Sequence, residues 1–203
     1  MKRLGFNLVL LGAPASGKET QTRILEKMYA LKSVETGVYT RTLLKEKSKN
    51  GDWTRRTAGK GGPLPVKLLK EFLVREIKNQ PKNKDLIFLG GPRLKPEAQL
   101  LKKILDTKKQ DFFVLYVTLP NKEVYKRSLK RKADKKTKAI YKVFDTEKII
   151  QARLKYYENQ VSKTVKYFKT IGKLKLINGK QPIPKVTKDI LKAIQKYRKW
   201  KEN

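Results

Sequence analysis

The segment that most constrains the fold is Gly12-Ala13-Pro14-Ala15-Ser16-Gly17-Lys18-Glu19-Thr20. It follows an apolar run over residues 6–11, which is typical of a buried strand, and it precedes a stretch with helical spacing of apolar residues. A glycine-rich loop between a strand and a helix lets backbone N–H groups surround a phosphate, while a lysine and the helix N-terminus attract its charge. The pattern predicts a phosphate-binding loop (P-loop) whose nucleotide contacts come from Ala15, Ser16, Gly17, Lys18, Glu19 and Thr20.

Two residues make this loop unusual. Ala15 stands where many such loops carry glycine, and its β-carbon leads us to expect a negative φ there. Glu19 places a carboxylate in the first helical turn, which suits the helix dipole but would repel a phosphate if it faced inward. We therefore expect Glu19 to point outward or to pair with a nearby lysine.

The remaining pattern alternates strands with helices. Strands are predicted at 6–11, 85–89, 112–119 and 174–177, and helices at 18–29, 36–47, 66–78, 95–106, 121–132, 145–168 and 184–200, with Asp145 as a cap and 49–65 as a loop or small insertion. Such alternation favours a parallel sheet covered on both faces. We predict one α/β domain over residues 1–203, a P-loop three-layer sandwich with about five parallel strands.

Composition limits the chemistry. The 203 residues include no histidine and no cysteine, so catalysis must use lysine, arginine, carboxylates, backbone amides and a metal ion. Lys+Arg 51 against Asp+Glu 18 gives a net charge of +33, which either serves contact with a polyanion such as RNA or reflects a lysine-rich proteome. The longest apolar run, 8–11, is too short to span a membrane, and no signal peptide is recognisable, so a cytoplasmic location is expected.

Several motifs, in order along most of the chain, resemble those of the adenylate kinase family of nucleoside monophosphate kinases, in its short-lid form. The loop at 12–21 is similar to the family's G-x-P-G-[AS]-G-K-G-T-Q, and Thr36-Gly37-Val38-Tyr39-Thr40-Arg41 looks like its T-G-D-x-x-R. Gly90-Gly91-Pro92-Arg93 resembles G-[FY]-P-R. Arg127 and Arg131 have the spacing of R-x-x-x-R, and the 178–182 turn resembles the family's G-x-[KQ]-P.

The resemblance implies roles for individual residues. It implies that Lys18, Arg93, Arg127, Arg131 and Arg153 stabilise the transferred phosphoryl group, and that Arg127, Arg131 and Gln181 belong to the ATP side. On the monophosphate side it implies Thr36, Arg41, Gly90, Arg93, Glu97, Lys142 and Arg153. It also implies a monophosphate-binding insertion over 36–65 and a short lid over 132–144 that closes over ATP.

The chain departs from the family at acidic positions. Val38 and Leu89 replace aspartates that help to hold hydrated Mg²⁺, and Phe144 replaces an acid after the lid. Mg²⁺ is therefore expected to arrive with ATP, supported weakly by the Thr20 hydroxyl and by Glu19 as a further candidate. Glu97 stands where the family's glutamine reads adenine. A carboxylate only accepts hydrogen bonds, so Glu97 could accept one from the adenine amino group but would suit a guanine edge better; the other interpretation is that it points to solvent.

The resemblance implies transfer of the γ-phosphoryl group of ATP to AMP, giving two ADP, by a monomer with no membrane partner. An alternative function is also open. The lost acids and the +33 charge are compatible with a catalytically weak, kinase-like nucleotide-binding protein that docks on RNA or a ribosome-like particle through a basic surface. Against this alternative, no strand combines aromatic and basic residues in the way used to stack single-stranded bases.

Overall fold

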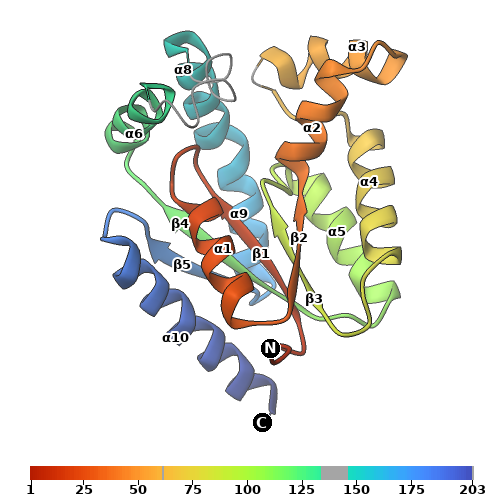
Figure 1. Cartoon of the computed structure of the whole chain (residues 1–203), viewed down its shortest axis with the longest axis vertical. Coiled ribbons are helices and arrows are strands. Elements are labelled where there is room, and N and C mark those ends of the chain that lie inside the picture. Colours follow the sequence, from red (N-terminus) through yellow and green to blue (C-terminus); the bar gives the residue numbers. More distant parts are fainter. Residues whose placement is uncertain (61, 134–145, 203) are drawn as a thin grey trace.

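A single sheet of five parallel strands forms the centre of the computed structural model, which describes residues 1–60, 62–133 and 146–202 (Figure 1). Its strands are β1 (Asn7–Gly12), β2 (Leu31–Glu35), β3 (Asp85–Leu89), β4 (Phe112–Thr118) and β5 (Leu174–Asn178). Their spatial order is β2-β3-β1-β4-β5, with every pair parallel. The predicted α/β fold is confirmed.

Helices cover both faces of this sheet. The helical elements of the described chain are α1 (Lys18–Met28), α2 (Thr36–Lys45), α3 (Lys49–Arg56), the 3₁₀ turn η1 (Ala58–Lys60), α4 (Val66–Lys78), α5 (Lys95–Thr107), α6 (Asn121–Ala133), α8 (Glu147–Tyr156), the π-helical turn η2 (Tyr157–Val161), α9 (Ser162–Thr170) and α10 (Ile183–Glu202). In Figure 1, α1 and α10 lie in front of the sheet, and α5 and α9 lie behind it.

The alternation of side chains along β1 divides the core into two layers. Leu8 and Leu10 belong to the apolar cluster that includes residues of α1 and α10. Val9 and Leu11 belong to the cluster that includes residues of α4, α5 and α9. A strand that is apolar on both faces is stable only between two layers of helices, which is why this run is continuous rather than alternating.

Three local features differ from the predictions or refine them. The strand β2 was missed because its sequence, Leu-Lys-Ser-Val-Glu, has only two buried apolar residues and lies at the sheet edge. The segment 49–65, predicted as a loop or small insertion, contains α3 and is therefore not a plain loop; the N-cap Ser48 of α3 accepts a hydrogen bond from the Gly51 N–H (3.1 Å). The single helix expected at 145–168 is divided by the π-helical turn, and its N-cap is Thr146; Asp145 lies outside the described residues.

The strand order brings the predicted motifs to one edge of the sheet. Because all five strands are parallel, the P-loop after β1, the 90–94 turn after β3 and the start of α2 after β2 leave the sheet at its carboxyl edge. Figure 1 shows α2 and α3 on one side of this edge and α6 and α8 on the other. Ligands of open parallel sheets bind at this edge.

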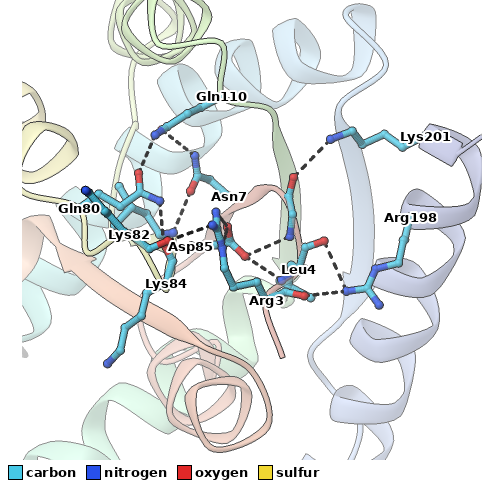
Figure 2. A network of polar contacts seen from close by, with 12 residues as sticks. Arg3, Leu4, Asn7, Gln80, Lys82, Lys84, Asp85, Gln110, Arg198 and Lys201 are labelled. Atoms are coloured by element: carbon cyan, nitrogen blue, oxygen red, sulfur yellow. Dashed lines mark hydrogen bonds and ion pairs between the residues drawn. The ribbon is translucent and has the colours of Figure 1, made fainter. Parts of the chain in front are cut away.

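At the opposite edge, a buried aspartate ties the N-terminus to the sheet (Figure 2). Asp85 is 2% exposed, and its carboxylate accepts hydrogen bonds from the Leu4 N–H (2.7 Å), the Gly5 N–H (3.1 Å) and both Nε (3.0 Å) and Nη2 (2.6 Å) of Arg3. Next to it, Asn7 accepts a hydrogen bond from the Leu86 N–H (2.8 Å). These contacts hold the start of β1 against β3.

We expect Asp85→Ala to lower the free energy of unfolding by about 2–3 kcal/mol, because it leaves two backbone N–H groups and one guanidinium without their partner. Urea denaturation measures this loss. The control is Asp106→Ala, which breaks an exposed ion pair with Lys102 and should cost about 0.5 kcal/mol or less. Equal losses in the two variants would contradict the role assigned to Asp85.

Candidate nucleotide site

The P-loop requires glycine at its first position. Gly12 has a φ of 155°, and a β-carbon placed on it would lie 2.6 Å from the Ser16 Oγ and 2.7 Å from the Val117 carbonyl oxygen. At the other end, Gly17 is the N-cap residue of α1 with a φ of 91°. The loop therefore turns tightly between the central strand and the helix, with the N-terminus of α1 at its end.

Ala15 contradicts the expectation of a negative φ. Its φ is 56°, in the left-handed region that favours glycine. A β-carbon in that region costs about 1–2 kcal/mol relative to the right-handed conformation. The chain thus keeps the loop conformation that glycine would adopt and bears the strain of an alanine within it.

Lys18 and Glu19 form an ion pair at the start of α1. The Lys18 Nζ lies 3.5 Å from the Glu19 carboxylate and donates a hydrogen bond to the Ala13 carbonyl (3.2 Å). Burial opposes ionisation of Glu19, but Lys18 and Arg131 hold the pKa of its carboxyl below the usual value. Glu19 is therefore ionised at neutral pH, and the expected pairing with a lysine is confirmed.

A cavity of about 350 Å³ opens beside this ion pair, a size typical of small-molecule sites. Its lining combines cations and carboxylates from the P-loop, α2, the 90–94 turn, α6 and α8. The predicted site residues that line it are Lys18, Glu19, Thr36, Arg41, Gly90, Arg93, Glu97, Arg131 and Arg153. Residues far apart in sequence thus converge on one space rich in positive charge.

Another part of the cavity is built by close packing of the start of α2 against the 90–94 turn. A β-carbon on Gly91 would lie 3.2 Å from the Thr36 Oγ1, and one on Gly90 would lie 3.5 Å from the Gly37 nitrogen. The Arg93 Nε donates to the Gly90 carbonyl (2.8 Å), and the buried Thr164 hydroxyl of α9 donates to the Arg93 carbonyl (2.7 Å). Arg93 is therefore fixed by its own turn and by α9.

Glu97 is buried, which contradicts the expectation that it points to solvent. It is 3% exposed, and its Oε2 accepts hydrogen bonds from the N–H groups of Arg93 (2.6 Å) and Leu94 (3.2 Å), so it caps α5. Desolvation raises the pKa of its carboxyl despite these bonds. Within the described residues, both hydrogen bonds of Glu97 go to Oε2, so Oε1 is the carboxylate oxygen that a ligand in the cavity would contact.

Two further predicted residues, Arg127 and Gln181, make contacts at the 178–182 turn, which lies against the P-loop. The Arg127 Nη1 donates to the Gly179 carbonyl (3.1 Å), and its Nε donates to Glu123 (2.7 Å). A β-carbon on Gly179 would lie 3.3 Å from the Ser16 carbonyl oxygen, so the 178–182 turn packs directly on the P-loop. Gln181 is held in that turn by hydrogen bonds to Asn178 and Asp189.

Six predicted site residues do not line the cavity, namely Ala15, Ser16, Gly17, Thr20, Arg127 and Gln181. Lys142 and most of the lid predicted at 132–144 lie outside the described residues. Conversely, four polar residues of the lining were assigned no site role from the sequence. Arg23 follows Glu19 by four residues, Tyr157 follows Arg153 by four, and Glu35 precedes and Thr40 lies within the 36–41 motif. Helical spacing could have found Arg23 and Tyr157.

The donor atoms next to the P-loop fit a magnesium ion that is held mostly by phosphates. Within residues 1–60, 62–133 and 146–202, no three acidic side chains gather into a metal cage. Thr20 is exposed outside the cavity, whereas the Glu19 carboxylate lines it. Mg²⁺ is commonly bound in proteins by one or two carboxylates, substrate phosphates and water, and Glu19 is a carboxylate of this kind beside the P-loop.

These features define a class of protein. A P-loop on the central strand of a 2-3-1-4-5 parallel sheet, facing a cationic cavity shared with α2 and the 90–94 turn, is typical of P-loop kinases that act on nucleoside monophosphates.

Comparison with known proteins identifies the family within this class. The family model for adenylate kinase matches residues 10–173. The chain is 31% identical to an adenylate kinase of Bacteroides fragilis over 93% of its length and 98% of that protein. It is 28% identical to an adenylate kinase of Fusobacterium nucleatum, with 94% of this chain and 99% of the relative covered. The chain belongs to the adenylate kinase family, a family of phosphotransferases.

Among its described helices, none is long and apolar enough to cross a membrane.

We expect Ala15→Gly to raise the free energy of unfolding by about 1 kcal/mol, because glycine adopts the left-handed conformation without strain. Thermal and urea denaturation measure the gain. Ala30→Gly serves as the control, since Ala30 has no positive φ and glycine there should destabilise the protein by about 0.5–1 kcal/mol. A loss of stability in Ala15→Gly would show that the loop is not strained at Ala15.

Proposed function

We propose that this protein transfers the γ-phosphoryl group of ATP to AMP, with ATP held by the P-loop and AMP held between α2 and the 90–94 turn. The observation that carries the proposal is the shared cavity. Lys18 and Arg131 line it on the P-loop side, and Arg41 and Arg93 line it on the α2 side. One phosphoryl group could therefore contact cations from both sides.

On the donor side, the backbone N–H groups at the start of α1 and the Lys18 ammonium would bind the β- and γ-phosphates. The buried Ser16 Oγ makes no hydrogen bond within the described chain and is available to a phosphate oxygen. The 178–182 turn, which packs on the P-loop at Gly179 and accepts a hydrogen bond from Arg127 of α6, would lie over the adenine of ATP. Phosphate binding would replace the contacts that Lys18 makes with Ala13 and Glu19.

On the acceptor side, Arg41 and Arg93 would bind the phosphate of AMP, and Thr36 and Glu97 would contact its base. The Arg41 Nη1 lies near the start of α2, since a β-carbon on Gly37 would be 3.4 Å from it. Glu97 would use Oε1 to accept a hydrogen bond from the adenine amino group, because Oε2 is committed to the cap of α5.

The protein itself forms no covalent bond during the proposed transfer. An oxygen of the AMP phosphate forms a bond to the γ-phosphorus while the bond from that phosphorus to the β–γ bridging oxygen of ATP breaks, which gives two ADP. The acceptor phosphate is already ionised, so no general base is required. Lys18 and the arginines, Arg153 among them, neutralise the charge spread over the transferred group. When bound, Mg²⁺ adds further neutralisation of the phosphates.

We expect Lys18→Ala to lower kcat about 100-fold or more, because it removes a cation from the transferred group. Arg41→Ala should instead raise KM for AMP more than KM for ATP. A coupled assay of ADP formation measures both. The control is Lys27→Ala, which changes an exposed lysine of α1 and should leave both constants unchanged. Absence of ADP formation by the wild type at high concentration, or unchanged turnover in Lys18→Ala, would overturn the proposal.

A second role, weak contact with nucleic acid, is favoured by one feature of α10. Its exposed lysines follow a spacing of three and four residues and form one row, which consists of Lys185, Lys188, Lys192, Lys196 and Lys199. None of the five ammonium groups makes an ion pair or hydrogen bond with the part of the chain that the structure describes. Such a row matches the repeated charges of a phosphate backbone better than scattered lysines do.

We expect Lys188→Glu/Lys192→Glu/Lys196→Glu to weaken RNA binding and to reduce the slope of log K against log salt by about 3. The matched control, Lys67→Glu/Lys70→Glu/Lys78→Glu on α4, changes the net charge equally and should reduce the slope less. Titrations of a labelled RNA at several salt concentrations give both slopes. Equal effects in the two variants would assign the binding to net charge and remove the role of α10.

A further inference from the structure

Glu19 is an acid at the place where phosphates are expected. It directly follows Lys18 in the first turn of α1, its side chain is 37% exposed, and it lines the cavity. Its ionised carboxylate lies 3.5 Å from the Lys18 Nζ. A negative charge so close to the P-loop would repel a phosphate group unless a cation lay between them.

The other carboxylates of the cavity cannot take the same position. Three acidic residues line it, Glu19, Glu35 and Glu97. Glu97 is committed to the N-terminus of α5 through Oε2. Glu35 ends β2 and directly precedes α2, so it belongs to the acceptor side. Within the described lining, Glu19 is therefore the one carboxylate on the P-loop itself.

Within the described residues, the other cavity positions that could face a metal ion supply no competing carboxylate on the P-loop side. Val38 and Leu89 line the cavity with apolar side chains, and Thr20 is exposed outside it. Mg²⁺ prefers oxygen ligands and keeps several waters when it is bound to a nucleotide. One carboxylate beside the phosphates, placed to contact the ion or one of its waters, is a common arrangement.

We propose that Glu19 supports the divalent cation that accompanies the donor nucleotide, releasing Lys18 to the phosphates when the nucleotide binds. The proposal rests on the assignment of the P-loop to ATP. It explains why an acid is tolerated beside Lys18: phosphates and Mg²⁺ arrive together, so Lys18 exchanges a carboxylate for a phosphate and Glu19 exchanges an ammonium for a metal ion. Without the metal, Glu19 would only hinder binding.

The test measures the coupling between metal and nucleotide in the absence of AMP, so that no catalysis is involved. Calorimetry gives Kd for ATP in excess EDTA and for ATP with saturating Mg²⁺, in the wild type and in Glu19→Gln. We expect Glu19→Gln to bind metal-free ATP at least as tightly as the wild type and MgATP more weakly. The ratio of the metal-free Kd to the MgATP Kd should fall about tenfold, the usual effect of losing a metal-supporting group.

Two further variants sharpen this result. Glu26→Gln removes an acid from α1 outside the cavity and should leave the ratio unchanged, while Glu19→Asp should retain part of the coupling. If Glu19→Gln improved both affinities by the same factor, Glu19 would act only by repulsion or by holding Lys18, and the proposal would be overturned. A fall in coupling without ADP formation from AMP would instead support Glu19 and contradict the proposed transfer.

Discussion

The pairing of β1 on both sides is the constraint on which the rest of the structure depends. β3 and β4 both pair with it in parallel, and its residues are buried along its whole length. The P-loop therefore leaves the centre of the sheet with its backbone direction fixed, and α1 must begin where the loop ends. The same parallel order brings the 90–94 turn and α2 to that edge, because their strands end there as well.

Cations in and beside the cavity at this edge have partners within the protein. In the lining, Lys18 pairs with Glu19 and the Arg93 side chain donates to the Gly90 carbonyl, while Arg127, outside the lining, pairs with Glu123. These contacts limit repulsion among closely placed cations. Phosphate groups offer stronger, charge-assisted hydrogen bonds to the same donors. A site with neither histidine nor cysteine can thus stabilise phosphoryl transfer by position and charge alone.

The sequence predicted the parts of this structure that local patterns determine. β3 and α4 have the predicted bounds, because each combines a clear apolar pattern with distinct flanking residues. β2 was missed because an edge strand with few apolar residues has almost no local signal. The family resemblance implied that Arg41, Arg93 and Arg153 act in one site. Charge and spacing alone could not have predicted this, because the three residues are far apart in the sequence. The left-handed Ala15 and the cap formed by Glu97 were beyond prediction, because both depend on backbone geometry that sequence spacing does not specify.

The central claim is that one cavity brings two nucleotides together for direct transfer. The most direct test is to follow ATP labelled in its γ-phosphoryl group during a reaction with unlabelled AMP. We expect the label to appear in the β-phosphate of ADP only when AMP is present, with little inorganic phosphate formed. Label that passes to inorganic phosphate at the same rate with and without AMP would contradict it.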